Sequence, residues 1–371
     1  MLIGIQPTAT AAEASLDDLR AAVTAAETAG DLVALNLALG NLGRGLLHDN
    51  QALPALTCFE RGVKVAQQLN DMEAGARHLA NQGIALAQIG NFSLAIRAFR
   101  KAYGFAQTLQ HDGLIYDIVL HLAELEQARE SPESALGLLD EALRLAERNH
   151  SEVRQLQVRR LLAAVHQQLD DAEQAEAHYE AALHLATALA DGPAQVDCLQ
   201  RLGALARAQR NQARAAEYFQ RALDLPDSEV GPQVLLALLA QLGDARFALG
   251  QLPAAQSAFE AALAGARQLG DQLSEARLLG SLGLTTAERG EAATALNWAN
   301  QAVALARQLE DELLLGEQLL FQAMALHDSD QLPAAQQACD EALALFEKLE
   351  ASSLVQKAYE LRDRLAADDE A

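Results

Sequence analysis

The nine histidines are the side chains of this sequence best suited to metal or acid–base chemistry, but their spacing builds no site. His178 and His184 are six positions apart, which places them on different faces of a helix, and no HExxH pair occurs. The stretch from His327 to Asp330, HDSD, has metal-ligand residue types but falls where a turn between helices is expected, and turns favour polar residues in any case. We therefore predict no metal site.

The stretch GNLGRG, from Gly40 to Gly45, superficially resembles a phosphate-binding loop. Its residue order differs from the phosphate-loop motif and no strand is expected before it, so close packing between helices explains these glycines better. No nucleophile lies beside a candidate base, and the sequence leaves open only a triad assembled from distant segments. We predict that the protein is not an enzyme and holds no cofactor.

The composition favours helices and a protein partner. Half of the residues are apolar but only 4% are aromatic, so alanine must fill much of the interior. Alanine is the best helix former and lets helices approach closely, which predicts many packed helices rather than sheets. The formal net charge of −23 repels polyanions. We expect neither nucleic acid nor an anionic membrane as a partner, and expect a protein or peptide instead.

The cysteines and the amino-terminal segment bear on the compartment. Cys58, Cys198 and Cys339 are widely spaced and odd in number, which fits the reduced thiols of a cytoplasm better than a disulfide framework. The segment MLIGIQPTAT has no basic region and too short an apolar run for a signal peptide, and no segment has 18 uninterrupted apolar residues. We expect a cytoplasmic protein, and the scarcity of lysine beside abundant alanine and glycine indicates a bacterial gene.

A repeat with a period of 40 residues organises the chain from about residue 31 to residue 350. An alanine recurs at one position of every unit: Ala55, Ala95, Ala135, Ala175, Ala215, Ala255, Ala295 and Ala335. Twelve residues earlier every unit has a small residue: Gly43, Gly83, Ala123, Ala163, Gly203, Gly243, Gly283 and Ala323. We place eight units at 31–70, 71–110, 111–150, 151–190, 191–230, 231–270, 271–310 and 311–350.

Two further positions follow the invariant alanine at helical spacing. Four residues on lies a mostly aromatic position: Phe59, Phe99, Leu139, Tyr179, Phe219, Phe259, Ala299 and Cys339. Three residues beyond it a small residue returns: Gly62, Ala102, Ala142, Ala182, Ala222, Ala262, Ala302 and Ala342. Spacings of four and three put these residues on one helix face, where small residues let paired helices touch while a large ring fills the space beside them.

Each unit reads as two helices joined by a short turn. Polar or glycine pairs such as Gly90-Asn91 and Gly290-Glu291 separate the two stretches, and glycine suits the end of a helix. An aspartate stands where the first helix of several units begins, as a helix N-cap should: Asp31, Asp71, Asp191, Asp271 and Asp311. The sequence predicts a helical hairpin repeated eight times.

These recurring positions resemble the tetratricopeptide repeat, whose signature is Leu-Gly, then Gly, then Ala, an aromatic residue and Ala. The second unit shows it as LANQGIALAQIGNFSLAIRAFRKAYGFA and the sixth as LLAQLGDARFALGQLPAAQSAFEAALAGA. The 40-residue spacing exceeds the usual 34 of that family and is similar to the long-helix arrays of Pins-type adaptors and of the bacterial MalT and Rap regulators. The pattern departs from the family at Ala299, Cys339 and Arg159, where local packing is in doubt.

The two ends of the chain read as half units that cap the array. We expect a disordered amino terminus over 1–10, a capping helix within 11–30, a second capping helix over 351–366 and a frayed acidic tail over 367–371. With eight hairpins, the fold class is all-α: a right-handed superhelical solenoid of antiparallel helix hairpins with about 18 helices. Pro226 should end one helix early and Pro232 begin the next, so we expect a modest hinge there.

The resemblance implies that a partner segment binds the concave face, which the first helix of each unit lines. At the amino-terminal end this names Asn41, Arg44, His48, Arg77 and Asn81. Amides of asparagine pair with a ligand backbone, and arginine grips a carboxylate. The alternative is that these residues form a solvated polar face.

The same face changes character along the array. In the middle it is polar, with both charge signs: Gln157, Arg160, Gln167, Gln200, Arg201 and Arg207, opposed by Asp117, Glu124 and Asp197. Towards the carboxyl end it is apolar: Phe247, Leu284, Leu320, Phe321 and Met324. We expect this apolar stretch to anchor a ligand helix or to pair two copies of the chain, against the alternative that it packs between neighbouring helices.

The sequence thus favours a scaffold or adaptor that captures a protein segment in its groove. The competing hypothesis is a Rap-like regulator that acts on a response regulator or transcription factor under the control of a small peptide. An array that serves as the sensor of a separate effector is a third possibility. The partner itself is not encoded in any motif.

Overall fold

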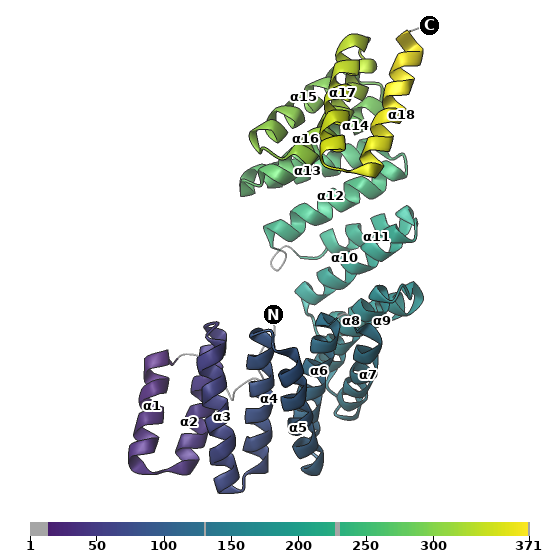
Figure 1. Ribbon diagram of the computed structural model, residues 1–371. Helices are drawn as coiled ribbons and strands as arrows, with labels where there is room; N and C mark the ends of the chain where they lie inside the picture. The colour runs from purple at the N-terminus through teal and green to yellow at the C-terminus, as the bar shows by residue number, and fades with distance from the viewer. Residues whose placement is uncertain (1–13, 130, 227–230, 370–371) are drawn as a thin grey trace. The chain divides into compact units, whose positions relative to one another are not determined.

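The computed structural model describes residues 14–129, 131–226 and 231–369, with backbone alone for residues 368 and 369. The expected disordered segment 1–10 and the end of the acidic tail lie outside these ranges. The described residues form eighteen helices and no strand, which confirms the predicted all-helical solenoid of hairpins (Figure 1). The chain divides after Leu189 into two compact units.

Each unit contains nine helices. The first holds α1 (Leu16–Ala29), α2 (Leu32–His48), α3 (Ala52–Leu69), α4 (Met72–Gln88), α5 (Phe92–Thr108), α6 (Asp112–Ala128), α7 (Pro132–Arg148), α8 (Glu152–Gln168) and α9 (Ala172–Ala188). The second holds α10 (Gly192–Ala208), α11 (Gln212–Leu223), α12 (Pro232–Ala248), α13 (Leu252–Leu269), α14 (Gln272–Glu288), α15 (Ala292–Gln308), α16 (Glu312–His327), α17 (Leu332–Lys348) and α18 (Ser352–Asp369). Within a unit, each helix packs mainly on the helices before and after it in the chain.

The connections between helices are nearly identical. Fifteen of them place a residue with positive φ at a spacing of 20 residues or a multiple of it: Gly30, Asn50, Asn70, Gly90, Gln110, His150, Asp170, Ala190, Arg210, Gly250, Gly270, Gly290, Glu310, Asp330 and Glu350. At the end of α3, for example, the N–H of Asn70 donates to the oxygen of Gln67 at 3.2 Å, and that of Asp71 donates to Ala66 at 2.9 Å. These bonds satisfy carbonyls that a helix end leaves without partners. A left-handed residue therefore ends one helix, and the next begins two residues later.

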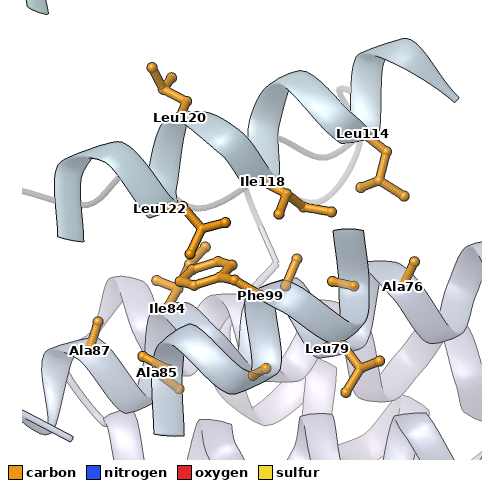
Figure 2. Packing of buried hydrophobic residues seen from close by; sticks show 14 of the residues in the cluster. Ala76, Leu79, Ile84, Ala85, Ala87, Phe99, Leu114, Ile118, Leu120 and Leu122 are labelled. Atoms are coloured by element: carbon orange, nitrogen blue, oxygen red, sulfur yellow. The ribbon is translucent and has the colours of Figure 1, made fainter. Parts of the chain in front are cut away.

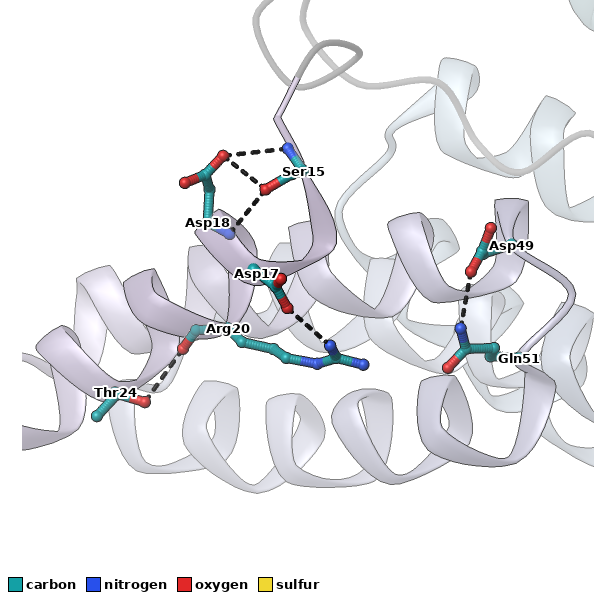
Figure 3. Close-up of polar contacts among 7 residues, drawn as sticks. All are labelled: Ser15, Asp17, Asp18, Arg20, Thr24, Asp49 and Gln51. Atoms are coloured by element: carbon teal, nitrogen blue, oxygen red, sulfur yellow. Dashed lines mark hydrogen bonds and ion pairs between the residues drawn. The ribbon is translucent and has the colours of Figure 1, made fainter.

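Side-chain caps fix the other end of many helices. Each of the five aspartates expected as N-caps, Asp31, Asp71, Asp191, Asp271 and Asp311, accepts a backbone N–H from the first turn of its helix. The first helix starts with a capping box, in which the Ser15 hydroxyl accepts the N–H of Asp18 at 3.2 Å and the Asp18 carboxylate accepts the N–H of Ser15 at 3.3 Å (Figure 3).

A ring on the second helix of a hairpin packs directly on a glycine of the first. A Cβ on Gly43 would lie 2.5 Å from the ring of Phe59, and one on Gly203 would lie 2.5 Å from the ring of Phe219. Gly83 with Phe99 and Gly243 with Phe259 repeat this contact. Figure 2 shows Phe99 enclosed by aliphatic side chains, among them Ile84 and Leu122. Where the first helix has alanine instead, the facing residue is Leu139, Tyr179 or Cys339.

The last two hairpins fill this space differently, which resolves the doubt that Ala299 and Cys339 raised. Beside Gly283 no ring is needed, because its nearest neighbours are the backbone of Ala295 and Ala299 and the Cβ of Trp298. In the eighth hairpin the bulk moves seven residues along α17 to Phe346, whose buried ring packs on Gly316, 2.6 Å from where a Cβ would stand. Arg159, the third departure, is half-buried and pairs with Glu147 at 3.1 Å.

The prolines act as expected, and the ends differ slightly from expectation. The helix before Pro226, α11, stops at Leu223, and α12 begins at Pro232. Whether this connection is a hinge stays a prediction. In α1, Leu19, Val23 and Ala26 are buried. The last helix runs to Asp369, beyond the expected end at residue 366.

The ring-on-glycine contact predicts opposite effects for one substitution at two equivalent positions. Gly203→Ala should lower the free energy of unfolding by about 1–3 kcal/mol, because its Cβ must displace the buried Phe219 ring. Gly283→Ala is the matched control: its Cβ has ordinary contacts, the nearest at 3.4 Å, so removing a helical glycine should stabilise by about 0.5–1 kcal/mol. Urea unfolding of both variants measures this, and equal effects would contradict the contact.

Candidate partner-binding surface

The predicted binding residues all lie on the first helices of the hairpins, and they divide between the two units. In the first unit they are Asn41, Arg44 and His48 on α2, Arg77 and Asn81 on α4, and Arg160 on α8. In the second unit they are Arg201 on α10, Phe247 on α12, Leu284 on α14, and Leu320, Phe321 and Met324 on α16. The two sets are therefore separate surfaces for the purposes of geometry.

A buried polar contact joins α2 to α4. The Nε2 of His78 lies 2.8 Å from the Oδ1 of Asn36, and because the amide oxygen accepts, the ring carries its proton on Nε2. The His78 ring also fills the space that a side chain at Gly62 of α3 would occupy and lies 3.3 Å from where a Cβ of Gly40 would stand. Burial, with a smaller effect of Arg44, lowers the pKa of His78 from 6.5 to about 4. The imidazole is therefore neutral and structural.

One helical turn further along, the predicted amino-terminal residues come together. The guanidinium of Arg44 donates to the Oδ1 of Asn41 at 2.6 Å, and Arg77 pairs with Glu73 at 2.8 Å. Burial, and then the charge of Arg77, lowers the pKa of Arg44 below its usual range. Arg44 is half-buried, and no carboxylate of the described residues pairs with it.

Asn81 lies on α4 between these groups. It is 2% exposed, and its Oδ1 has no hydrogen-bond partner. A buried amide oxygen without a donor costs about 1–3 kcal/mol of stability. His48, at the end of α2, is exposed. The structure thus brings Asn41, Arg44, Arg77 and Asn81 close to one another on α2 and α4 and leaves His48 at the edge.

The polar lining continues across α6 and α8. Arg154 lies over the ring of Tyr116, 4.5 Å from its centroid, and its guanidinium is 3.5 Å from Asp117. Burial raises the pKa of Asp117, although Arg154 opposes the shift. The Tyr116 hydroxyl donates towards the carbonyl oxygen of Arg154 at 3.2 Å or the Oε1 of Gln157 at 3.3 Å. These charges are already matched within the protein, so this stretch has less unused bonding capacity than α2 and α4.

In the second unit the predicted polar residues pair with one another. Arg201 is exposed and lies 3.5 Å from Asp197 on its own helix. Arg207 of α10 approaches Asp244 of α12 at 3.4 Å, and burial raises the pKa of that carboxyl. Such exposed pairs contribute little to stability.

The predicted apolar stretch is half-buried rather than open. None of Phe247, Leu284, Leu320, Phe321 and Met324 is among the exposed large apolar side chains. Phe247 packs against the cluster around Phe259, and Leu320 and Met324 pack against the cluster around Phe346. Phe321 reaches Gly280 on the neighbouring helix α14. Packing between helices accounts for much of this stretch, and its role in binding stays a prediction.

A close approach of α16 to α14 explains one more buried polar group. Gln318 is 2% exposed, its Oε1 has no partner, and that oxygen occupies the place where a Cβ of Gly280 would be. The equivalent position is leucine in the two preceding hairpins, Leu238 and Leu278. Gly280 therefore makes room for a side chain whose polarity the fold does not use.

Sequence reasoning missed two features of the first unit. Val33 and Leu37 of α2 are 67% and 66% exposed, on the same helical face as Asn41 and Arg44. Their four-residue spacing was a readable signal. The rings of His166 and His178 stack at 5.4 Å with an interplanar angle of 17°, although they lie twelve residues apart on different helices, so no local spacing could reveal the pair.

Among the described residues, no group of three or more histidines, cysteines or carboxylates is placed to hold a metal ion. The three cysteines are free and buried. In the same part of the chain, none of the helices combines the length and the apolar character needed to cross a bilayer.

Comparison with known proteins assigns the class and then the family. The stacked hairpins make this a helical-repeat protein. Residues 154–228 and 234–308, which span α8 to α11 and α12 to α15, match the tetratricopeptide repeat family. The chain is a tetratricopeptide repeat protein. No curated protein sequence matches it.

Several solved structures share the fold at low sequence identity. The apo form of RapI is 13% identical, with a TM-score of 0.63 over 91% of this chain and 98% of that one. A signal-transduction ATPase with a tetratricopeptide repeat sensor from Pyrococcus horikoshii is 13% identical, with a TM-score of 0.61 over 93% of this chain and 52% of that one. BtubC from P. vanneervenii is 22% identical, with a TM-score of 0.50 over 58% and 91%. These likenesses concern the fold.

The low pKa of His78 predicts acid sensitivity of the first unit. The unfolded chain takes up a proton on this histidine near pH 6.5, whereas the folded chain does so only near pH 4. The free energy of unfolding should therefore fall as the pH drops from 6.5 to 4, by up to about 3 kcal/mol. His78→Gln keeps a donor for Asn36 but cannot titrate, so urea unfolding at pH 7, 5.5 and 4.5 should show a weaker pH dependence. The same dependence in both proteins would contradict this assignment.

The orphaned oxygen of Gln318 predicts a stabilising substitution. Gln318→Leu should raise the free energy of unfolding by about 1 kcal/mol, because it removes a buried acceptor without a donor. Gly280→Ala is the counterpart and should destabilise by about 1–3 kcal/mol, because its Cβ enters the space of the glutamine. Thermal unfolding compares the two, and destabilisation by Gln318→Leu would show that the amide has a partner.

Proposed function

We propose that the protein is a scaffold or adaptor that captures a segment of another protein on the inner face of its first helices. The observation that carries this proposal is the unused hydrogen-bonding capacity of α2 and α4. Asn81 makes no side-chain hydrogen bond although it is buried, and Arg44 has an amide as its only side-chain partner. Folded proteins rarely leave such groups unmatched unless a ligand supplies the partner.

The other inner-face residues fit this role in different ways. Arg160 and Arg201 extend the polar surface, one in each unit, and the half-buried apolar residues of α14 and α16 offer anchor positions in the second. Pairing of two copies through that apolar stretch is a further proposal that sedimentation of the native protein tests. No catalytic group is needed for capture, and we propose a non-enzymatic protein whose buried free cysteines suit a reducing cytoplasm.

A Rap-like regulator is the second candidate. The observation that favours it is the likeness to RapI along nearly the full length of both chains. In that role the partner would be a response regulator or a transcription factor, and a small peptide would switch the complex. Binding of purified response-regulator domains would support this candidate, whereas an adaptor of another kind would leave them in solution.

Capture should depend on the arginines of α2 and α4. The double substitution Arg44→Ala and Arg77→Ala should lower the amount of partner retained by the immobilised full chain about tenfold, while thermal stability changes little, because the Arg77–Glu73 pair is half-exposed. Arg97→Ala with Arg100→Ala, on the exposed face of α5, is the control and should retain the partner. Equal capture by both double variants would show that the α2 and α4 cluster is a solvated face.

A further inference from the structure

Arg44 differs from its neighbour arginine in what balances its charge. Arg77 pairs with Glu73, and Arg154 pairs with Asp117, whereas Arg44 meets only the neutral amide of Asn41. This is unexpected in a chain with a net charge of −23. A half-buried guanidinium that donates to one amide still has donors to offer, and a carboxylate accepts two of them at once.

The apolar half of the same surface lies two to three turns earlier on α2. Val33, Leu37, Asn41 and Arg44 follow spacings of four, four and three, which keeps them on one helix face. Val33 and Leu37 are among the most exposed large apolar side chains of the described chain, at 67% and 66%. At a rise of 1.5 Å per residue, the seven residues from Leu37 to Arg44 span about 10 Å along the helix.

Asn81 adds a backbone contact to this pair. Because His78 reaches Asn36 and Gly40, the residue one turn further along α4 lies beside the segment of α2 that carries Asn41 and Arg44. The Oδ1 of Asn81 lacks a donor, and its side chain is 98% shielded from solvent, since it is 2% exposed. A peptide N–H is the donor that an extended segment presents beside its side chains.

We infer that the inner face of α2 recognises an extended protein segment that carries an aspartate or glutamate three to five residues from an aliphatic or aromatic side chain. The carboxylate pairs with Arg44, the apolar side chain covers Leu37 and Val33, and a backbone N–H of the segment donates to Asn81. The residue spacing follows from the distance of about 10 Å between the two contacts and an advance of about 3.3 Å per residue in an extended chain. This inference rests on the proposed function and specifies the ligand for its first hairpins.

A random dodecapeptide library displayed on phage, joined through the carboxyl end of each peptide, tests the inference with the full-length protein. No displayed peptide then has a free terminal carboxylate, so an acidic preference must come from side chains. Selection on the native protein should enrich the acidic and apolar pair at the stated spacing. Selection on Arg44→Gln should lose the acidic preference, and selection on Leu37→Ser should lose the apolar one.

The strongest enriched peptide, synthesised with an amidated end, gives the affinities. Its Kd should rise at least tenfold with Arg44→Gln and about fivefold with Leu37→Ser, and stay unchanged with Arg97→Gln on the exposed face of α5. Asn81→Leu should weaken binding while raising the melting temperature, because leucine stands at the equivalent position Leu161; this combination separates a ligand contact from a structural one.

Each other result overturns the inference. Enriched peptides without an acidic preference, or equal affinity for Arg44→Gln, would leave the proposed capture function standing and remove this ligand chemistry. Weaker binding by Asn81→Leu together with a lower melting temperature would assign Asn81 to the core and remove its contact from the proposal. No enrichment on the native protein would overturn both this inference and the proposed function.

Discussion

A buried ring can lie against a facing helix only where that helix has room for it, and this constraint sets how closely the paired helices approach. Phe59, Phe99, Phe219 and Phe259 each face a glycine, while the smaller or differently shaped Leu139, Tyr179 and Cys339 face an alanine. One added methyl group at a glycine would collide with the ring, so the two positions are coupled although twelve to sixteen residues separate the two helices' contacts in the sequence. The hairpin stays nearly constant while the surface residues around it vary freely.

The fold was predictable because this coupling repeats. A single Gly43 says little, but eight small residues at one position and eight alanines twelve residues later could be read without any structure. The relocation of bulk to Phe346 could not be read in the same way. It depends on Gly316, thirty residues earlier on another helix, and nothing in a local pattern links the two. Periodicity predicts the average hairpin, and three-dimensional packing decides the exceptions.

The candidate site was predictable only as a set of positions. The sequence places Asn41, Arg44, Arg77 and Asn81 on first helices, but their bonding state depends on what each meets across the helix pair. Arg77 finds Glu73, whereas Arg44 finds no carboxylate, and Asn81 is buried without a partner. The apolar stretch shows the reverse difference: position suggested an open surface, and packing of Phe321 on Gly280 closes part of it. Whether a polar side chain is satisfied is a property of neighbours, not of spacing.

The left-handed residues at the helix ends also restrict how such a chain can change in length. One residue inserted into a helix would rotate every later side chain by about 100° around that helix, and the ring of one hairpin would no longer face its glycine. A whole segment of 20 residues, from one left-handed residue to the next, restores the phase but exchanges inner helices for outer ones. Only steps of 40 residues preserve both, so growth of this array proceeds in whole hairpins, and each added hairpin brings a new inner surface free to acquire its own specificity.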